Sequence, residues 1–177
     1  MKSRIFIFLI LIGFTSCSEQ EARRPVTASK IYTLAATTES LKKINSLEEA
    51  KIENYILKDS LNNYIRSSNG FWYQYITKID EDTTKPKKGD VVELQYDFVD
   101  LNDQIIYSKD QIGTKKYKVD KEDFVPAIQM GVKIMKVGET VKFIIPSYNA
   151  FGVVGDQNKI GINQSIISRV TLININK

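Results

Sequence analysis

The sequence of 177 residues contains no histidine and a single cysteine, Cys17. Without histidine, the chain cannot form the Ser-His-Asp or Cys-His pairs of hydrolases, a histidine-ligated zinc site or an imidazole acid–base catalyst. One cysteine also leaves no partner for a disulfide within the chain. An enzyme built from this sequence must therefore work without a strong nucleophile or with carboxylates only, and we expect neither a metal nor an organic cofactor.

Blocks of basic residues are missing as well. The formal net charge is +4, and acidic and basic residues alternate along the chain. The nearest approach to a basic cluster is Lys85, Lys87 and Lys88, which is typical of a solvated loop before a strand. The composition therefore predicts no nucleic-acid partner.

The only long apolar run, residues 5–14, follows Lys2 and Arg4. It is too short to span a bilayer, which takes about 20 residues, but it suits the core of a signal peptide. The residues that follow, Phe14-Thr-Ser-Cys17, resemble a bacterial lipobox. We expect residues 1–16 to be removed and Cys17 to carry lipid, which anchors the protein to a membrane of the cell envelope, on the outer-membrane or periplasmic side. The alternative is an ordinary secreted protein with a chance cysteine.

Two segments precede the region where strands are expected. Residues 17–38 are rich in Ser, Thr, Glu and Arg and include Pro25, which predicts a flexible, lipid-anchored tether. Residues 39–69 form an amphipathic helical segment, either one helix over 40–66 or two with a break near Asp59-Ser60. Two alternatives stay open: this helix packs on its own domain, or it binds a partner or a second copy of the chain. The apolar positions of its stripe are Leu41, Ile44, Leu47, Ile52, Tyr55, Ile56, Leu61 and Ile65.

From Gly70 onward the apolar residues alternate with polar ones, a pattern typical of half-buried antiparallel strands. Strands are expected over 71–76, 91–98, 105–107, 117–119, 141–145 and 166–172, with a turn at Asn102-Asp103. Pro126 opens one short helix, and Gly138 follows its end. Residues 70–177 are thus predicted to form an α+β domain, an antiparallel sheet wrapped on one short helix.

Several motifs in this region resemble the FKBP-type peptidyl-prolyl isomerases. They are Pro86-Lys-Lys-Gly-Asp, Met135-Lys-Val-Gly-Glu and Ile145-Pro-Ser-Tyr-Asn-Ala-Phe-Gly152. The resemblance covers residues 70–177. A narrower resemblance links Glu21-Ala-Arg-Arg-Pro-Val26 and Gly70-Phe-Trp-Tyr to GldI, the gliding-motility lipoprotein group of the Bacteroidota.

The resemblance implies a site for the proline ring. Tyr96 and Ile106 would be walls, Tyr117 an aromatic floor and Ile128 the base, while Val125 would bind the substrate backbone through its N–H. Ile106 and Ile128 stand where Phe and Trp are usual, and Phe151 replaces the usual Tyr. Around them, Ile160 would line the loop side, Ser168 falls where Phe is common, and Tyr107 falls where Asp is usual.

This thinned aromatic box predicts weak catalysis. The resemblance implies that the chain isomerises prolyl bonds of proline-containing polypeptides in the envelope and so assists the folding of exported proteins, including those of a gliding machinery. The alternative is a weakly active or inactive FKBP-like binding module or chaperone in an envelope complex. A third reading, a structural partner recruited through residues 40–66, depends on the helix.

Overall fold

A computed structural model describes residues 27–59, 61–81 and 84–177. The predicted signal peptide, Cys17 and the first part of the predicted tether lie outside these residues. The chain divides into two units, Met1–Thr38 and Glu39–Lys177. Every strand among the described residues belongs to the second unit. Among the described residues, no helix combines enough length with enough apolar character to cross a bilayer.

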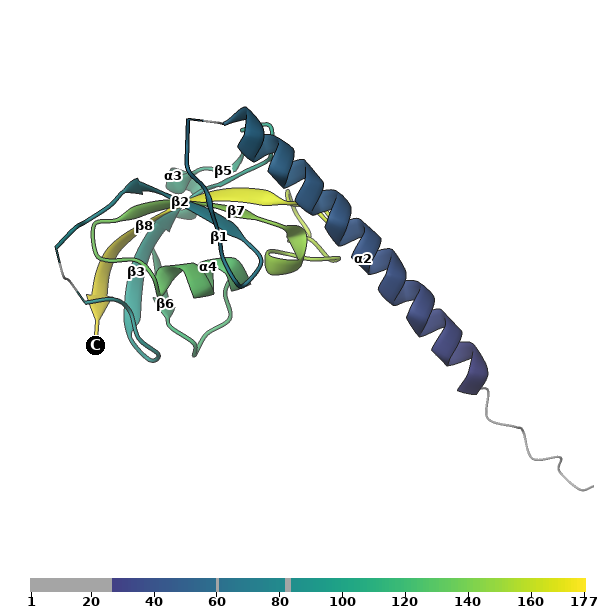
Figure 1. The fold of residues 1–177 in the computed structure, drawn as a ribbon. Coiled ribbons are helices and arrows are strands. Elements are labelled where there is room, and N and C mark those ends of the chain that lie inside the picture. The colour runs from purple at the N-terminus through teal and green to yellow at the C-terminus, as the bar shows by residue number, and fades with distance from the viewer. Residues whose placement is uncertain (1–26, 60, 82–83) are drawn as a thin grey trace, which may run out of the picture. The chain divides into compact units, whose positions relative to one another are not determined.

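The strands form one sheet in which every pairing is antiparallel (Figure 1). Its main path runs β1-β2-β7-β8-β3-β6, while β4 pairs with β8 and β5. The predicted α+β class is therefore confirmed, and each expected strand is found within a few residues of its expected bounds. The strands are β1 (Ile65–Arg66), β2 (Trp72–Thr77), β3 (Val91–Tyr96), β4 (Phe98–Val99), β5 (Ile105–Tyr107), β6 (Lys115–Lys118), β7 (Thr140–Ile145) and β8 (Ile166–Asn176).

Helix α4 (Pro126–Val132) is the predicted short helix, and the sheet curls around it (Figure 1). Pro126 occupies the first turn, where a missing N–H costs no hydrogen bond. The packing is so close that a Cβ on Gly131 would lie 2.5 Å from ring carbons of Phe143 in β7. The face of the sheet toward α4, called the inner face below, holds the larger apolar core.

Two short helical elements were not predicted. Helix α3 (Lys109–Ile112) follows β5 and begins with a capping box, in which Ser108 and Gln111 bind each other's backbone N–H groups. A 3₁₀ turn, η1 (Ser147–Asn149), follows β7. Both elements lie below the length at which apolar periodicity is readable in a sequence.

Helix α2 runs from Thr27 to Lys58, which corrects the expected bounds at both ends. Residues 27–38 are helical where a flexible tether was expected. These residues contain neither Pro nor Gly, the two residue types that disfavour helix most, so the segment can be helical although it has few apolar residues. At the other end, the predicted break near Asp59 is found, but no second helix follows. The Asp59 carboxylate accepts hydrogen bonds from Asn62 Nδ2 and Tyr64 Oη, both at 2.6 Å, and the chain turns there.

Residues 65–66 pair with β2 instead of extending the helix. Gly70, at a φ of 79°, makes the turn between β1 and β2, and the Ser67 N–H donates to the Phe71 carbonyl at 2.8 Å. Positive φ costs glycine little, which suits it to this turn. The segment expected to be helical up to residue 69 therefore ends in a hairpin.

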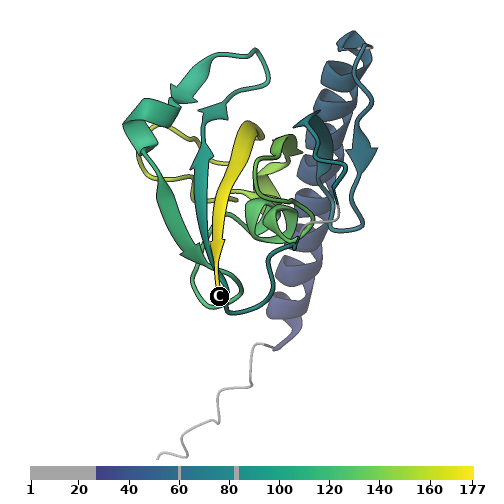
Figure 2. The ribbon, with the colours of Figure 1, turned by 90° about the vertical axis from the view of Figure 1, so that its left-hand side faces the viewer.

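The part of α2 from Glu39 onward packs on the other side of the sheet, called the outer face below (Figure 2). Ile52 is fully buried there among Trp72, Ile144 and Ile167, with Tyr55 and Ile56 at the edge. Other residues of the predicted apolar stripe remain exposed: Leu41, Leu47, Leu61 and Ile65. The helix therefore packs on its own domain through part of its stripe. That residues 70–177 fold without it stays a prediction.

The turn expected at Asn102-Asp103 is present, closed by the Asp103 N–H bond to the Asp100 carbonyl. Asp100 Oδ1 accepts the N–H groups of Asn102 and Gln104 at 2.8 and 2.9 Å, which shapes the expected turn. In the segment after α4, the buried Glu139 carboxylate accepts the N–H groups of Ile79 and Lys136 at 3.0 and 2.8 Å.

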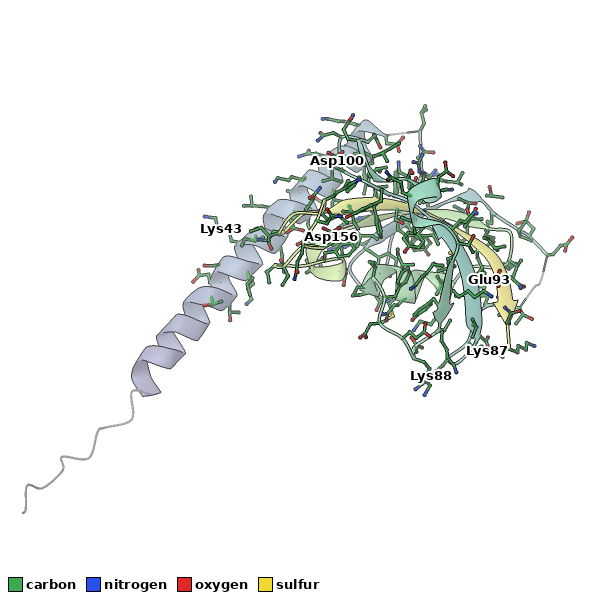
Figure 3. The ribbon with its side chains drawn as sticks, turned by 180° about the vertical axis from the view of Figure 1, so that it is seen from behind. Lys43, Lys87, Lys88, Glu93, Asp100 and Asp156 are labelled. Atoms are coloured by element: carbon green, nitrogen blue, oxygen red, sulfur yellow. The ribbon has the colours of Figure 1, made fainter. Side chains whose placement is uncertain are left out.

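The exposed Lys87 and Lys88 lie in the loop before β3, as expected of a solvated loop (Figure 3).

Candidate functional site

The six side chains predicted to form the site lie in one apolar cluster on the inner face. Those of Tyr96, Tyr117, Val125 and Ile128 are buried, while Ile106 and Phe151 are partly buried against the same cluster. They come from β3, β5, β6, the start of α4 and the loop between β7 and β8. Tertiary structure thus brings together six residues spread over 56 positions of sequence, from Tyr96 to Phe151.

A continuous chain of aromatic rings runs through this cluster. Phe151 meets Phe98 edge-on at 5.6 Å between centroids, and Phe98 meets Tyr96 at 5.3 Å. Tyr96 then meets Phe124 at 5.4 Å, and Phe124 stacks on Tyr117 at 5.3 Å. These are the separations that aromatic pairs favour. These five rings, Phe151, Phe98, Tyr96, Phe124 and Tyr117, together form a continuous apolar surface, called the ring wall below.

Two further rings of this chain, Phe98 and Phe124, were not among the residues that the sequence placed at the site. Phe98 follows Tyr96 by two positions, so both rings emerge on the inner face. Phe124 directly precedes Val125, and its carbonyl accepts a 2.8 Å hydrogen bond from the Gln129 side chain. The period-two alternation of this strand places Phe98 on the same face as Tyr96, and this signal could have added Phe98 to the site. Phe98 and Phe124 thus add aromatic surface to a cluster in which Ile106, Ile128 and Ser168 stand where the family usually has aromatic residues.

Ser168 lies in the floor beside Phe98. Because Val99 pairs with Ile167 and Phe143 with Ser168, the Ser168 side chain lies between two buried phenylalanines. It is fully buried, and its hydroxyl has no hydrogen-bond partner among the described residues. Ile160, expected on the loop side, is 3% exposed and belongs to the same cluster.

Two polar groups of this cluster have unused hydrogen-bonding capacity. Within the part of the chain that the structure describes, neither the Tyr96 hydroxyl nor the Val125 N–H takes part in a hydrogen bond. Burial raises the pKa of Tyr96, so its hydroxyl keeps its proton and can donate. Val125 precedes the first helical residue, Pro126, and its carbonyl already accepts from Gln129.

Tyr107 and Asp156 fix the loop that carries Phe151. The Tyr107 hydroxyl donates to Asp156 at 2.5 Å, and the other Asp156 oxygen accepts the N–H groups of Asn158 and Ile160 at 2.9 and 2.7 Å. Burial acts to raise the pKa of Asp156, but these hydrogen bonds outweigh burial and hold the pKa below its ordinary value. At position 107, where the resemblance implies Asp is usual, this chain has a tyrosine that bonds to the loop.

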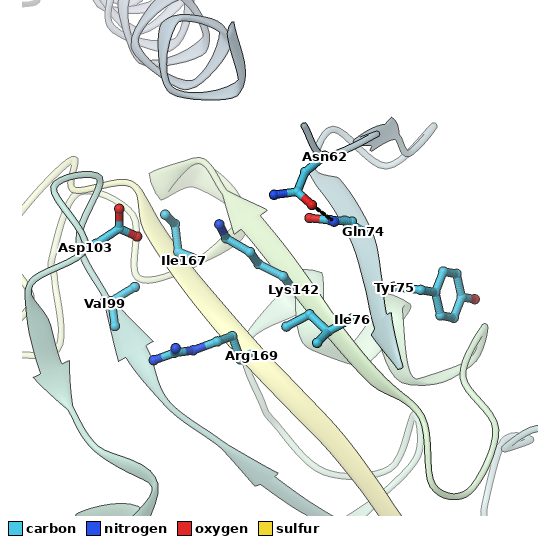
Figure 4. Close-up of a pocket in the computed structure, with 9 residues that line it drawn as sticks. All are labelled: Asn62, Gln74, Tyr75, Ile76, Val99, Asp103, Lys142, Ile167 and Arg169. Atoms are coloured by element: carbon cyan, nitrogen blue, oxygen red, sulfur yellow. Dashed lines mark hydrogen bonds between the residues drawn. The ribbon is translucent and has the colours of Figure 1, made fainter. Parts of the chain in front are cut away.

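The outer face has a separate cavity of about 440 Å³ (Figure 4). Its two cations already have carboxylate partners: Lys142 Nζ lies 3.4 Å from Asp59, and Arg169 Nε donates to Asp97 at 2.8 Å. The Lys142 ammonium also lies 4.9 Å from the ring centre of Tyr55. No group of three or more Cys, Asp or Glu side chains within the described ranges is placed to hold a metal ion. The cavity is lined by Asn62, Gln74, Tyr75, Ile76, Val99, Asp103, Lys142, Ile167 and Arg169.

Residues 82–173 match the model of the family described as "FKBP-type peptidyl-prolyl cis-trans isomerase". The chain is also 36% identical over 98 residues to "FK506-binding protein 2" of Dictyostelium discoideum, an alignment that covers 55% of this chain and 74% of that protein. This chain belongs to the FKBP-type peptidyl-prolyl isomerase family. Its activity is accordingly the cis-trans isomerisation of peptidyl-prolyl bonds.

Solved structures of this family share the fold. FkpA from Escherichia coli matches with a TM-score of 0.61 at 21% identity, over 99% of this chain and 82% of FkpA. A peptidyl-prolyl isomerase from Pseudomonas syringae matches with a TM-score of 0.62 at 16% identity, over 77% of this chain and 96% of the other. At these identities, the likeness supports the FKBP fold and no finer property.

FKBP chemistry suits a chain without histidine. Rotation about a prolyl bond crosses a barrier of about 18–20 kcal/mol without any covalent step. An apolar wall that strips water from the prolyl carbonyl disfavours the planar, resonance-stabilised amide more than the twisted one. The ring chain from Phe151 to Tyr117 is apolar in this way, and its partly buried members are Phe151 and Phe124.

Proposed function

We propose that this chain is a lipid-anchored prolyl isomerase of the bacterial cell envelope that assists the folding of exported proteins. The observation that carries the catalytic part is the continuous ring wall, Phe151–Phe98–Tyr96–Phe124–Tyr117, with the Val125 N–H at its side. The sequence Phe14-Thr-Ser-Cys17 after a short apolar run supports the anchor.

The narrower part of the proposal is membership of the GldI group, with gliding-machinery proteins among the clients. Its support is the pair of segments Glu21-Ala-Arg-Arg-Pro-Val26 and Gly70-Phe-Trp-Tyr. In the second segment, Phe71 and Trp72 are buried on opposite faces of the sheet, so the aromatic residues also have structural roles. Loss of gliding on deletion of the gene, restored by the wild-type chain but not by a Phe151→Ala chain, tests this part.

A second candidate is an FKBP-like binding module with little turnover. It is favoured by Ile128, which is fully buried at the base where the family usually has Trp, and by Phe151, which offers no hydroxyl to a ligand carbonyl. Refolding of a substrate protein limited by a prolyl bond separates the two. A catalyst accelerates the slow phase in proportion to its concentration, whereas a binding module captures the substrate without turnover.

The anchor is tested independently of the activity. Growth with a labelled fatty acid should mark the wild-type chain, and Cys17→Ala should lose the label and leave the membrane fraction. The purified Cys17→Ala protein should keep its isomerase activity, because residue 17 lies far in sequence from the site. Label that persists in Cys17→Ala would show that the cysteine is not the lipidated residue.

A further inference from the structure

Glu48 of α2 is a buried carboxylate on an otherwise solvated stretch of helix. Its side chain is 5% exposed. Oε2 accepts the Ser147 N–H at 2.7 Å and the Ser165 hydroxyl at 3.1 Å, and Oε1 accepts the Ser147 hydroxyl at 2.6 Å. A buried carboxylate is tolerated when such hydrogen bonds replace its water. Glu48 therefore has a specific docking site on the sheet domain.

The two serines mark the two ends of the loop that carries Phe151. Ser147 comes two residues after β7, and Ser165 directly precedes β8. One carboxylate from α2 thus joins both ends of this loop. Closing a loop of this length costs conformational entropy, which a bridge across its ends reduces.

Hydrogen bonds continue from Ser147 to the site. The Ser147 carbonyl accepts the Gly152 N–H at 2.8 Å, and the Gly152 carbonyl accepts the Asn163 N–H at 2.9 Å. Phe151, next to Gly152, then meets Phe98. A short bonded path therefore leads from Glu48 to the outer ring of the aromatic wall.

Neighbouring contacts hold this part of α2 in place. Ile52, one turn after Glu48, is fully buried against Ile144 and Ile167, which lie at the ends of β7 and β8 that flank the loop. Glu49 accepts a hydrogen bond from the Tyr148 hydroxyl at 2.9 Å and pairs with Arg66. The helix and the loop are thus joined at several points.

We propose that Glu48 is a positioning residue for the prolyl site, through which α2 holds Phe151 against Phe98. The proposal rests on the isomerase activity. It makes residues 39–58 a working part of the enzyme, although they share no residue with the ring wall. Release of α2 would loosen the loop and withdraw Phe151.

The first experiment compares Glu48→Ala and Glu48→Gln with Glu53→Gln, an exposed glutamate on the same helix. All are assayed well below their unfolding midpoints. Glu48→Ala should lower kcat/KM about tenfold, since displacement of a reacting group by about 1 Å can cost up to about a hundredfold. Glu48→Gln keeps an acceptor of the same shape and should lower it about threefold, roughly half that free energy. Glu53→Gln should match wild type. Full activity in a folded Glu48→Ala protein would overturn the proposal.

A double-mutant cycle with Phe151→Ala separates positioning from general loosening. If Glu48 acts through Phe151, adding Glu48→Ala to Phe151→Ala should change kcat/KM less than about twofold, since coupled sites are not additive. Effects that multiply in full would contradict the proposal.

Amide exchange provides a readout that does not depend on activity. The Gly152 and Asn163 N–H groups, both bonded within the loop, should exchange faster in Glu48→Ala, while those of β7 and β8 stay protected. An unchanged loop would overturn the positioning role even if activity fell. A wild-type protein without isomerase activity would instead refute the catalytic assignment, and loop exchange would still decide whether Glu48 positions the loop.

Discussion

The two faces of the sheet are built from the same strands, but they bury different kinds of side chains. In β8, Ile166, Ser168 and Val170 point to the inner face, while Ile167 and Arg169 point to the outer face. The inner face is an apolar, ring-lined core around α4. The outer face mixes a small apolar cluster with paired charges under α2.

This difference assigns a separate task to each face. A dry ring surface suits a reaction that requires removal of water from a carbonyl. Directional hydrogen bonds accepted by buried carboxylates suit the fixing of one element on another. The inner face should therefore respond to changes of volume, and the outer face to the loss of an apolar anchor or of one member of a bonded pair.

The largest effect is expected on the outer face, from Ile52→Ala. Ile52 is fully buried, so its truncation should lower the free energy of unfolding by about 2–5 kcal/mol. Trp72, the only tryptophan, packs in the same cluster, so its fluorescence should report the loosened helix. Leu57→Ala, on the same helix at 73% exposure, is the control and should change stability by less than about 0.5 kcal/mol. If Ile52→Ala lowers the free energy of unfolding as little as Leu57→Ala does, α2 does not contribute to the stability of the sheet domain.

On the inner face, Gly131→Ala should destabilise through overpacking. The added methyl carbon would lie 2.5 Å from the ring of the buried Phe143, and forced shifts of this kind cost about 1–3 kcal/mol. Phe143→Leu in the same protein should recover part of the loss, because it makes room for the methyl group. Met130→Ala, at 39% exposure on the same helix, serves as the control. Denaturant unfolding measures all four proteins, and no loss in Gly131→Ala would mean that the inner face is loosely packed.

Two buried serines should respond with opposite signs when changed to alanine. Ser168 on the inner face has no hydrogen-bond partner among the described residues, so Ser168→Ala should raise the free energy of unfolding by up to about 1 kcal/mol. Ser147 is 2% exposed and donates its hydroxyl to Glu48, so Ser147→Ala should lower it by about 1–2 kcal/mol. If both variants change the free energy of unfolding in the same direction, the proposed difference between the two faces is wrong.

The smallest effect is a pH dependence at the rim of the site. The pKa of Asp156 is held below its ordinary value of 3.8, so its contribution to stability is complete above that value and is lost as pH falls through the lowered pKa. The stability difference between wild type and Asp156→Asn should be constant at and above about pH 6 and should shrink below about pH 3.5. A difference that grows in acid would reverse the assigned sign. Denaturant unfolding at a series of pH values measures it.

The sequence predicted the inner face better than the outer one. Period-two alternation located the strands, and Pro126 located α4, because both patterns arise within single elements. The hairpin of β1 and β2 was missed, since Ile65 continued a helical spacing and only its pairing with Tyr73 shows it to be a strand. Pairing between distant segments has no local signal.

The helix shows the same limit. Its stripe predicted Leu47 as an inward residue, yet Leu47 is 55% exposed while its neighbour Glu48 is 5% exposed. A helical stripe indicates an apolar side but not which surface it meets, and the partners of Glu48 lie 99 and 117 positions away in sequence. At the site, the resemblance placed six residues in one cluster. The resemblance did not mark Phe98, two positions after Tyr96, or Phe124, directly before Val125.

The most direct test of the account is the refolding of a protein limited by a prolyl bond, with wild type and Phe151→Ala compared. Wild type should accelerate the slow phase. Phe151→Ala should lower that acceleration at least tenfold, or about 1.4 kcal/mol of transition-state stabilisation, while its unfolding midpoint moves little because Phe151 is only partly buried. A wild-type protein without acceleration, or a Phe151→Ala protein with full activity, would contradict the ring wall as the prolyl site.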